Sequence, residues 1–187
     1  MYRKILMVLC LALIIIAPAQ AKEIGGVNLS DTITAGKEQL VLNGAGVRKK
    51  FFVKAYAGGL YLKTRENNAQ KIVDADEPMA IRLRFIYDGV SCKQLVEGWN
   101  EGFADATRGN LGPIKDRADT FNSFFTEDAR KGDIYDMIYT PGEGVRVSIK
   151  GKLMGTIKGL DFKKALFAIW LGEKPVDSSL KQGMLGK

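Results

Sequence analysis

Residues 42–62 constrain the fold of this chain more than any other segment. From Val47 onward the segment is rich in aromatic and β-branched side chains, which suit the pleated surface of a sheet. Just before them stand Asn43, Gly44 and Gly46, residue types that accept positive φ. The pattern therefore predicts a tight turn followed by one long strand or a pair of strands, where a buried sheet begins.

Arg48 stands where this sheet is expected to begin. A guanidinium keeps its charge, so an inward-pointing Arg48 needs a carboxylate, another anion or a ring of carbonyl oxygens beside it. The simpler alternative is a structural arginine whose apolar stem packs on the sheet while its head group reaches solvent. Arg48 is the first candidate site residue.

Residues 1–21 have the pattern of a secretory signal peptide. Arg3 and Lys4 form a basic start, residues 5–16 are apolar, and residues 19–21 supply a small-x-small cleavage pattern. The apolar run is too short to span a bilayer comfortably. We therefore expect a periplasmic or secreted protein whose mature chain, residues 22–187, is one domain without a stable membrane span.

The charge of the chain points away from nucleic acid. Residues 1–21 hold two of the 28 basic residues and none of the 21 acidic ones, which leaves 28 − 2 = 26 basic residues and a formal charge of +5. Apart from the pairs Lys49-Lys50 and Lys163-Lys164, the basic residues are scattered. We therefore predict no nucleic-acid partner.

The chemistry open to this chain is narrow because it contains no histidine. Nucleophiles activated by histidine and the usual zinc sites are therefore excluded. Cys92 is the only cysteine of the predicted mature chain, so no internal disulfide forms, and we expect a buried thiol. We predict no metal and no cofactor, which leaves arginine, lysine, tyrosine and the carboxylates for any chemistry.

Hydrophobic periodicity predicts both strands and helices. Predicted strands lie within residues 22–34 and at 39–42, 47–62, 79–87, 132–140, 145–150 and 152–158. Predicted helices lie at residues 68–75, from a capping box at 91–94 to about 103, at 114–125, from a cap at Asp161 to Gly172, and within 175–185.

The order of these elements predicts an α+β fold. The connections between the last strands are too short for crossovers, so the sheet must be antiparallel. Arg82 and Arg84 alternate with apolar residues and are expected on a solvated face, while the apolar helices cover the other face. A cleft between the helices and the sheet would admit a small apolar ligand.

Four segments, residues 43–48, 55–62, 141–144 and 170–177, resemble the chalcone isomerase-like family, in particular its secreted bacterial branch. The resemblance covers nearly all of residues 22–187. It implies an open-faced β-sandwich, in which a large antiparallel sheet has helices packed on one face. This agrees with the order of elements predicted from periodicity.

In the plant isomerases of this family, a phenolate adds to an enone within the same molecule. The arginine after Gly-Ala-Gly-x helps to hold the substrate and to stabilise charge on its carbonyl oxygen, and Arg48 matches it. Tyr56 occupies the position of a family threonine, so a hydroxyl is kept on a longer side chain.

Other catalytic positions of the plant enzymes match less well. Asn100 matches the family asparagine if Lys93 takes the place of the tyrosine seven residues before it. A register one residue earlier pairs Cys92 with Trp99, and neither register restores the tyrosine. The family's late threonine or serine has no clear counterpart in residues 159–164.

Non-enzymatic relatives that bind fatty acids pair the arginine with a tyrosine, and Arg48 with Tyr56 would hold a carboxylate in the same way. Eight steps of unbroken strand would separate the two residues by about 26 Å, so a turn must lie between them, most simply at Lys49-Lys50. The apolar residues expected to line an acyl slot are Val53, Leu60, Phe85, Leu95 and Trp99.

Three functions follow from these observations. The first is a non-catalytic protein that binds a small apolar ligand, such as a fatty acid or a polyphenol, through Arg48 and Tyr56. The second is an isomerase of chalcone-like substrates in which Arg48, Tyr56 and Asn100 act on the substrate. The third is an interaction module of the cell envelope in which Arg48 is structural.

Overall fold

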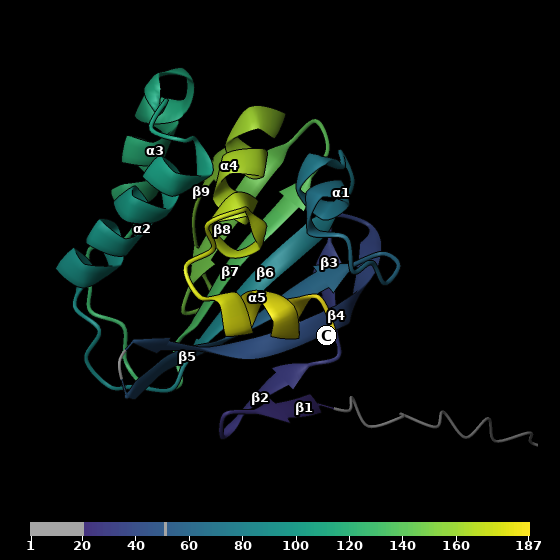
Figure 1. Ribbon diagram of the computed structural model, residues 1–187, viewed down its shortest axis with the longest axis vertical. Helices are drawn as coiled ribbons and strands as arrows, with labels where there is room; N and C mark the ends of the chain where they lie inside the picture. Colours follow the sequence, from purple (N-terminus) through teal and green to yellow (C-terminus); the bar gives the residue numbers. More distant parts are fainter. Residues whose placement is uncertain (1–20, 51) are drawn as a thin grey trace, which may run out of the picture.

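The computed structural model describes residues 21–50 and 52–187, so the predicted signal peptide lies outside the described residues except for Ala21. A seven-stranded antiparallel sheet forms the body of the molecule, with its strands side by side in chain order (Figure 1). The strands are β3 (Thr32–Ala35), β4 (Glu38–Lys50), β5 (Val53–Leu62), β6 (Met79–Phe85), β7 (Ile134–Thr140), β8 (Gly144–Ile149) and β9 (Lys152–Ile157). A separate hairpin contains β1 (Ala21–Ile24) and β2 (Val27–Ser30).

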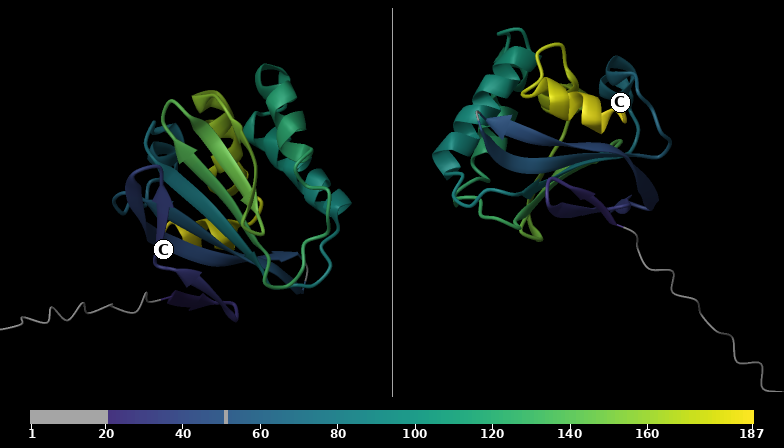
Figure 2. Two further views of the ribbon diagram at one scale, coloured as in Figure 1. Left: turned by 180° about the vertical axis from the view of Figure 1, so that it is seen from behind. Right: turned by 60° about the horizontal axis from the view of Figure 1, so that its bottom comes forward.

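The helices cover one face of this sheet, as Figures 1 and 2 show. They are α1 (Ala69–Asp74), α2 (Cys92–Ala106), the short 3-10 helix η1 (Gly112–Ile114), α3 (Lys115–Asn122), α4 (Leu160–Leu171) and α5 (Ser178–Met184). The main core lies between them and the sheet, and α4 is buried over most of its length. The predicted α+β fold, with helices on one face of an antiparallel sheet, is confirmed.

The face of the sheet away from the helices is only partly solvated, which corrects one expectation. Arg82 donates two hydrogen bonds to the Asp136 carboxylate, at 2.7 and 2.8 Å, and a third to Ser30 Oγ. Arg84 donates to Asn28 O at 2.8 Å. Strand β2 thus packs over this face, and the charges of the two arginines are used to hold it there.

The tight turn predicted at Asn43–Gly46 is wrong, because β4 continues through these residues, with a shift of register against β5 between Leu42 and Gly44. Neither Gly44 nor Gly46 has positive φ. Helix α5 instead lies so close to the strand that a Cβ on Gly46 would be 3.0 Å from Leu180 Cα, and one on Gly44 would collide with Gly183 O. These glycines are needed for close packing.

Further expectations had mixed outcomes. The capping box of Ser91 and Gln94 is present at the start of α2. Asp161 does not cap α4; Gly159 is the N-cap, and the Asp161 carboxylate binds Arg117 at 2.7 Å instead. Cys92 is a free thiol but only half-buried. Met184 approaches the backbone closely at Gly58, where a Cβ would be 2.6 Å from Met184 Cε.

Residues 21–50 and 52–187 contain neither a membrane-spanning helix nor a group of side chains suited to a metal ion. No helix in these ranges is long and apolar enough to cross a bilayer. No group of acidic or cysteine side chains in the same ranges could hold a metal ion.

Candidate ligand-binding site

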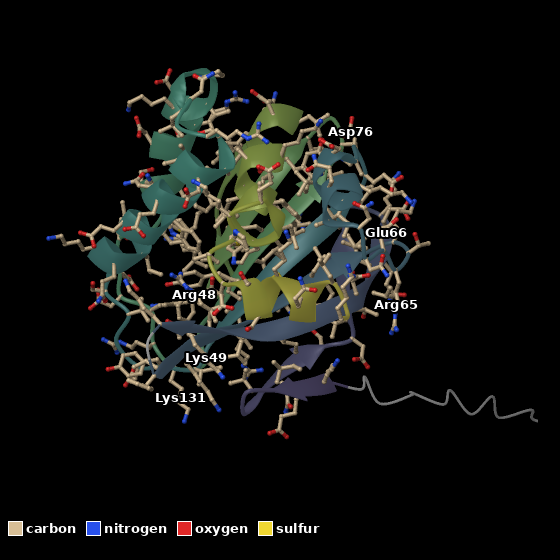
Figure 3. The ribbon with its side chains drawn as sticks, viewed as in Figure 1. Arg48, Lys49, Arg65, Glu66, Asp76 and Lys131 are labelled. Carbon is tan, nitrogen blue, oxygen red and sulfur yellow. The ribbon has the colours of Figure 1, made fainter. Side chains whose placement is uncertain are left out.

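Arg48 and Tyr56 are directly opposite each other on the β4–β5 hairpin. The chain reverses between Lys50 and Val53, which confirms the turn that cooperation of the two residues requires. The turn follows Lys49 and Lys50, where it was predicted, because both lysines still pair with β5. The Arg48 guanidinium carbon lies 5.9 Å from the centroid of the Tyr56 ring. Figure 3 shows Arg48 on the helix side of β4 and Lys49 on the other side. Pairing of the two strands thus brings together a cation and a phenol that are eight positions apart in the sequence.

A cavity of about 380 Å³ opens beside this pair, between the hairpin, the end of β6 and α2. Its size falls in the range of roughly 300–1,000 Å³ that is usual for small-molecule sites. The predicted site residues that line it are Arg48, Tyr56, Val53, Phe85, Leu95 and Trp99.

Two predicted site residues do not line this cavity. Leu60 is fully buried in the main core instead. Asn100 is exposed on the side of α2 that faces α3, where its Oδ1 accepts a hydrogen bond from Asn122 Nδ2 at 2.7 Å. The helical turn that places Trp99 in the cavity wall directs Asn100 away from it.

The hydroxyl of Tyr56 is a neutral donor at the inner end of the cavity. Trp170 Nε1 donates a hydrogen bond to the Tyr56 oxygen at 3.0 Å, so the phenol proton is left for another acceptor. Burial raises the pKa of Tyr56, although the nearby charge of Arg48 opposes this shift. Tyr56 therefore stays protonated at neutral pH.

Two buried N–H groups of the cavity wall, Arg48 Nε and Trp99 Nε1, have no acceptor among the described residues. The Arg48 side chain passes within 4.0 Å of the Cβ position of Gly98, and no ion pair joins it to a carboxylate of the described chain. A buried donor without an acceptor is costly, so this arrangement suits a ligand that brings an oxygen anion. Arg84 Nε also lacks an acceptor, but Arg84 is on the opposite face under β2.

Two residues that hold Tyr56 and the hairpin in place, Trp170 and Asp177, were not among the predicted site residues. Trp170 was expected only as part of the helix that ends at Gly172, yet its Nε1 donates a hydrogen bond to the Tyr56 hydroxyl. Asp177 accepts from the Lys49 backbone N–H at 3.0 Å and from the Leu180 N–H at 2.9 Å, and so ties α5 to the hairpin. Both residues belong to the segment 170–177 that carried the family resemblance, and that was the available signal.

The comparisons with known proteins identify the family of this chain. A family model described as chalcone isomerase-like matches residues 21–186. This chain belongs to the chalcone isomerase-like family. Fatty-acid-binding protein 1 of Arabidopsis thaliana is 21% identical to it in an alignment 173 residues long, which covers 77% of this chain and 62% of that protein. This member of the family thus spans less than two thirds of that relative's length.

A solved structure supports the fold. The crystal structure of an Arabidopsis thaliana fatty-acid binding protein superposes with a TM-score of 0.70 at 19% identity, over 86% of this chain and 92% of that one. The predicted membership and the predicted fold of this family member are confirmed. Its assignment to a secreted bacterial branch remains a prediction.

Proposed function

We propose that this family member binds a small apolar carboxylate, most simply a fatty acid, and does not convert it chemically. We further propose that it does so in the periplasm or outside the cell, because residues 1–21 have the pattern of a secretory signal. The Arabidopsis thaliana relative, described as a fatty-acid-binding protein both by its name and by its crystal structure, supports the ligand class.

In this proposal the carboxylate lies against Arg48, whose Nε–H is a charge-assisted donor, and accepts a second hydrogen bond from the Tyr56 hydroxyl. The acyl chain packs against the apolar walls given by Phe85, Leu95 and Trp99. The observation that carries the proposal is the buried Arg48 Nε beside a cavity, with no acceptor in the described chain.

Isomerase chemistry is the weaker candidate for this site. Arg48 could stabilise charge on a carbonyl oxygen. However, Asn100 lies outside the cavity, and neither register of the family pattern, with Lys93 or with Cys92, supplies the tyrosine of the plant enzymes. The groups that would position and deprotonate a phenol are therefore not assembled around Arg48.

Native mass spectrometry of gently extracted protein tests the proposal. The wild type should retain an acyl carboxylate, and Arg48→Ala and Tyr56→Phe should each deplete it. Arg146→Ala removes the same charge from an exposed position on β8 and should retain the ligand. Ring closure of a chalcone above its spontaneous rate would favour the isomerase. Absence of any ligand, with loss of stability in Arg48→Ala, would favour a structural arginine.

A further inference from the structure

The tip of the β4–β5 hairpin exposes large apolar side chains at the mouth of the cavity. Phe52 is fully exposed, Val53 is 40% exposed, and Tyr87 of the neighbouring loop is 48% exposed. The Tyr87 backbone N–H donates to Ala55 O at 3.2 Å, which holds that loop against the hairpin. Val53 and Tyr87 also line the cavity. An apolar surface therefore surrounds one side of its entrance.

The same hairpin carries three lysines. Lys49 and Lys54 are directly opposite each other across the two strands, and Lys50 is opposite Val53. Like charges in directly opposite positions destabilise a strand pair. None of the ion pairs between described residues involves any of these three lysines. The hairpin thus gathers three lysines without an ion pair in the described chain, and the Asp177 carboxylate at the Lys49 backbone N–H offsets only one of these charges.

The loop before β7 adds to this charge at the same end of the sheet. The Gly132 N–H donates to Phe85 O at 2.9 Å, which places the preceding residue, Lys131, near the strand end that holds Tyr56. Figure 3 shows Lys131 and Lys49 at this end of the molecule. The acidic residues of the entrance, Glu97 and Glu101, are on the opposite wall, which α2 forms. The basic side of the entrance is therefore the hairpin side.

We propose that this hairpin docks on the surface of a bilayer that contains anionic lipid, with Phe52 inserted at the boundary between head groups and acyl chains. Aromatic side chains favour that boundary, and lysines favour anionic head groups. The docked hairpin would present the cavity entrance to the membrane, where fatty acids partition. This last step rests on the proposed function, whereas docking itself does not require a ligand.

A second copy of this chain is a less suitable partner for the hairpin than an anionic bilayer. A two-fold contact through Phe52 would bring Lys49, Lys50 and Lys54 of one copy near the same lysines of the other. Such juxtaposed like charges oppose association. An anionic bilayer has the complementary charge and also an apolar interior for the exposed side chains.

Sedimentation with lipid vesicles tests the docking, using residues 22–187, which contain every strand of the seven-stranded sheet and all of the core. The wild type should bind vesicles of phosphatidylcholine with phosphatidylglycerol more tightly than phosphatidylcholine alone, and salt should weaken this binding. Lys49→Glu combined with Lys54→Glu should weaken it by at least about 25-fold, since each basic side chain contributes roughly fivefold. Phe52→Ser should weaken it by about tenfold.

The far end of the sheet offers matched controls. Lys37→Glu combined with Lys187→Glu makes the same change in charge at two exposed positions, and Val41→Ser removes a partly exposed apolar side chain from β4. These variants should bind vesicles as the wild type does. Equal weakening by the control and hairpin variants would overturn the proposal, because it would reflect net charge alone.

Two further measurements separate the possible failures. Fatty-acid affinity, measured in solution without vesicles, should be unchanged in Phe52→Ser and lost in Arg48→Ala, whereas Arg48→Ala should still bind vesicles. A wild type that binds fatty acid but shows no preference for anionic vesicles would overturn docking and leave ligand binding intact. A wild-type dimer in sedimentation without vesicles that Phe52→Ser converts to a monomer would identify self-association instead.

Discussion

Two cations on the helix side of the sheet, Lys163 and Arg48, both lie beside aromatic rings. They differ in whether their N–H donors have acceptors in the described chain. Lys163, on α4, is fully buried, and its ammonium lies 5.5 Å from the ring centroids of both Tyr139 and Phe167. It donates to three backbone carbonyls at the end of α1, those of Ile72, Val73 and Ala75, at 3.1, 2.9 and 2.7 Å. Each proton of this ammonium therefore has an acceptor.

Arg48 also lies beside an aromatic ring, that of Tyr56, but its buried Nε–H has no acceptor in the described chain. It borders a cavity, whereas the acceptors of Lys163 are part of the fold. The difference teaches that burial of a cation does not by itself mark a site. A cation with all its donors satisfied stabilises the fold, and a cation with a free donor beside a cavity is available to a ligand.

Lys163→Met gives the largest expected effect. The substitution keeps an apolar side chain in the core but leaves the three carbonyls at the end of α1 without their donor. We expect the free energy of unfolding to fall by about 3 kcal/mol, from roughly 1–3 kcal/mol for each buried group left unpaired, partly offset because a buried charge is removed. Chemical denaturation measures this.

Lys164→Met is the matched control for this substitution. Its ammonium is partly exposed and pairs with the Asp74 carboxylate at 3.1 Å. An exposed pair of this kind contributes at most about 1 kcal/mol. Equal losses of stability in the two variants would contradict the structural role assigned to Lys163.

Arg48→Met should leave stability unchanged and reduce fatty-acid affinity. Without ligand, the variant loses a donor that has no acceptor, so its stability should equal or slightly exceed that of the wild type. Fatty-acid affinity should fall by about 2 kcal/mol, or roughly 30-fold, because a charge-assisted hydrogen bond is lost. Titration calorimetry and denaturation of the same samples check both. A large loss of stability without loss of affinity would make Arg48 a second structural cation.

The two tryptophans beside the site, Trp99 and Trp170, allow the same comparison between an N–H that has an acceptor in the described chain and one that does not, with a smaller expected effect. Their ring centroids are 5.7 Å apart, but only Trp170 has a hydrogen-bond partner for its N–H, the Tyr56 hydroxyl. Trp170→Phe should reduce stability by about 1 kcal/mol more than Trp99→Phe does, since it breaks a made hydrogen bond. Thermal unfolding of the ligand-free variants measures this. The reverse order would show that the Tyr56 hydroxyl is not held by Trp170.

The fold could be predicted from the sequence because its elements have strong periodic patterns. The alternation in residues 79–87 and the helical periodicity between Asp161 and Gly172 were enough to place β6 and α4. The turn at Gly44 and Gly46 was mispredicted because glycine suits both positive φ and close packing. Only the three-dimensional position of α5, which comes from the far end of the chain, distinguishes the two reasons.

The site was predictable in part. Arg48 and Tyr56 were paired from the family resemblance, which required a turn between them, and the hairpin register has the two residues opposite each other. Asn100 was expected from the family pattern, but it points to the outer surface of α2. On a helix, a shift of one residue is enough to move a side chain from the cavity wall to that surface. Trp170 could not be assigned to the hydroxyl of Tyr56, because the contact joins residues 114 positions apart.

A change of pH should affect the two cations differently. Burial is the main cause that lowers the pKa of Lys163 to about 8, with a contribution from Lys164, while Asp76, Asp74 and Glu77 oppose it. Since the ordinary value is 10.5, the unfolded chain holds more protons between pH 8 and 10.5, and stability should rise with pH there.

Denaturation between pH 8 and 9.5, below the range in which ordinary tyrosines ionise, isolates this rise, and Lys163→Met should abolish it. Fatty-acid affinity should stay constant over the same range, because burial raises the pKa of Tyr56 and its hydroxyl remains a donor. Affinity that falls together with this titration would couple the ligand to Lys163. The two cations would then act as one system, and their division into a structural and a binding cation would be wrong.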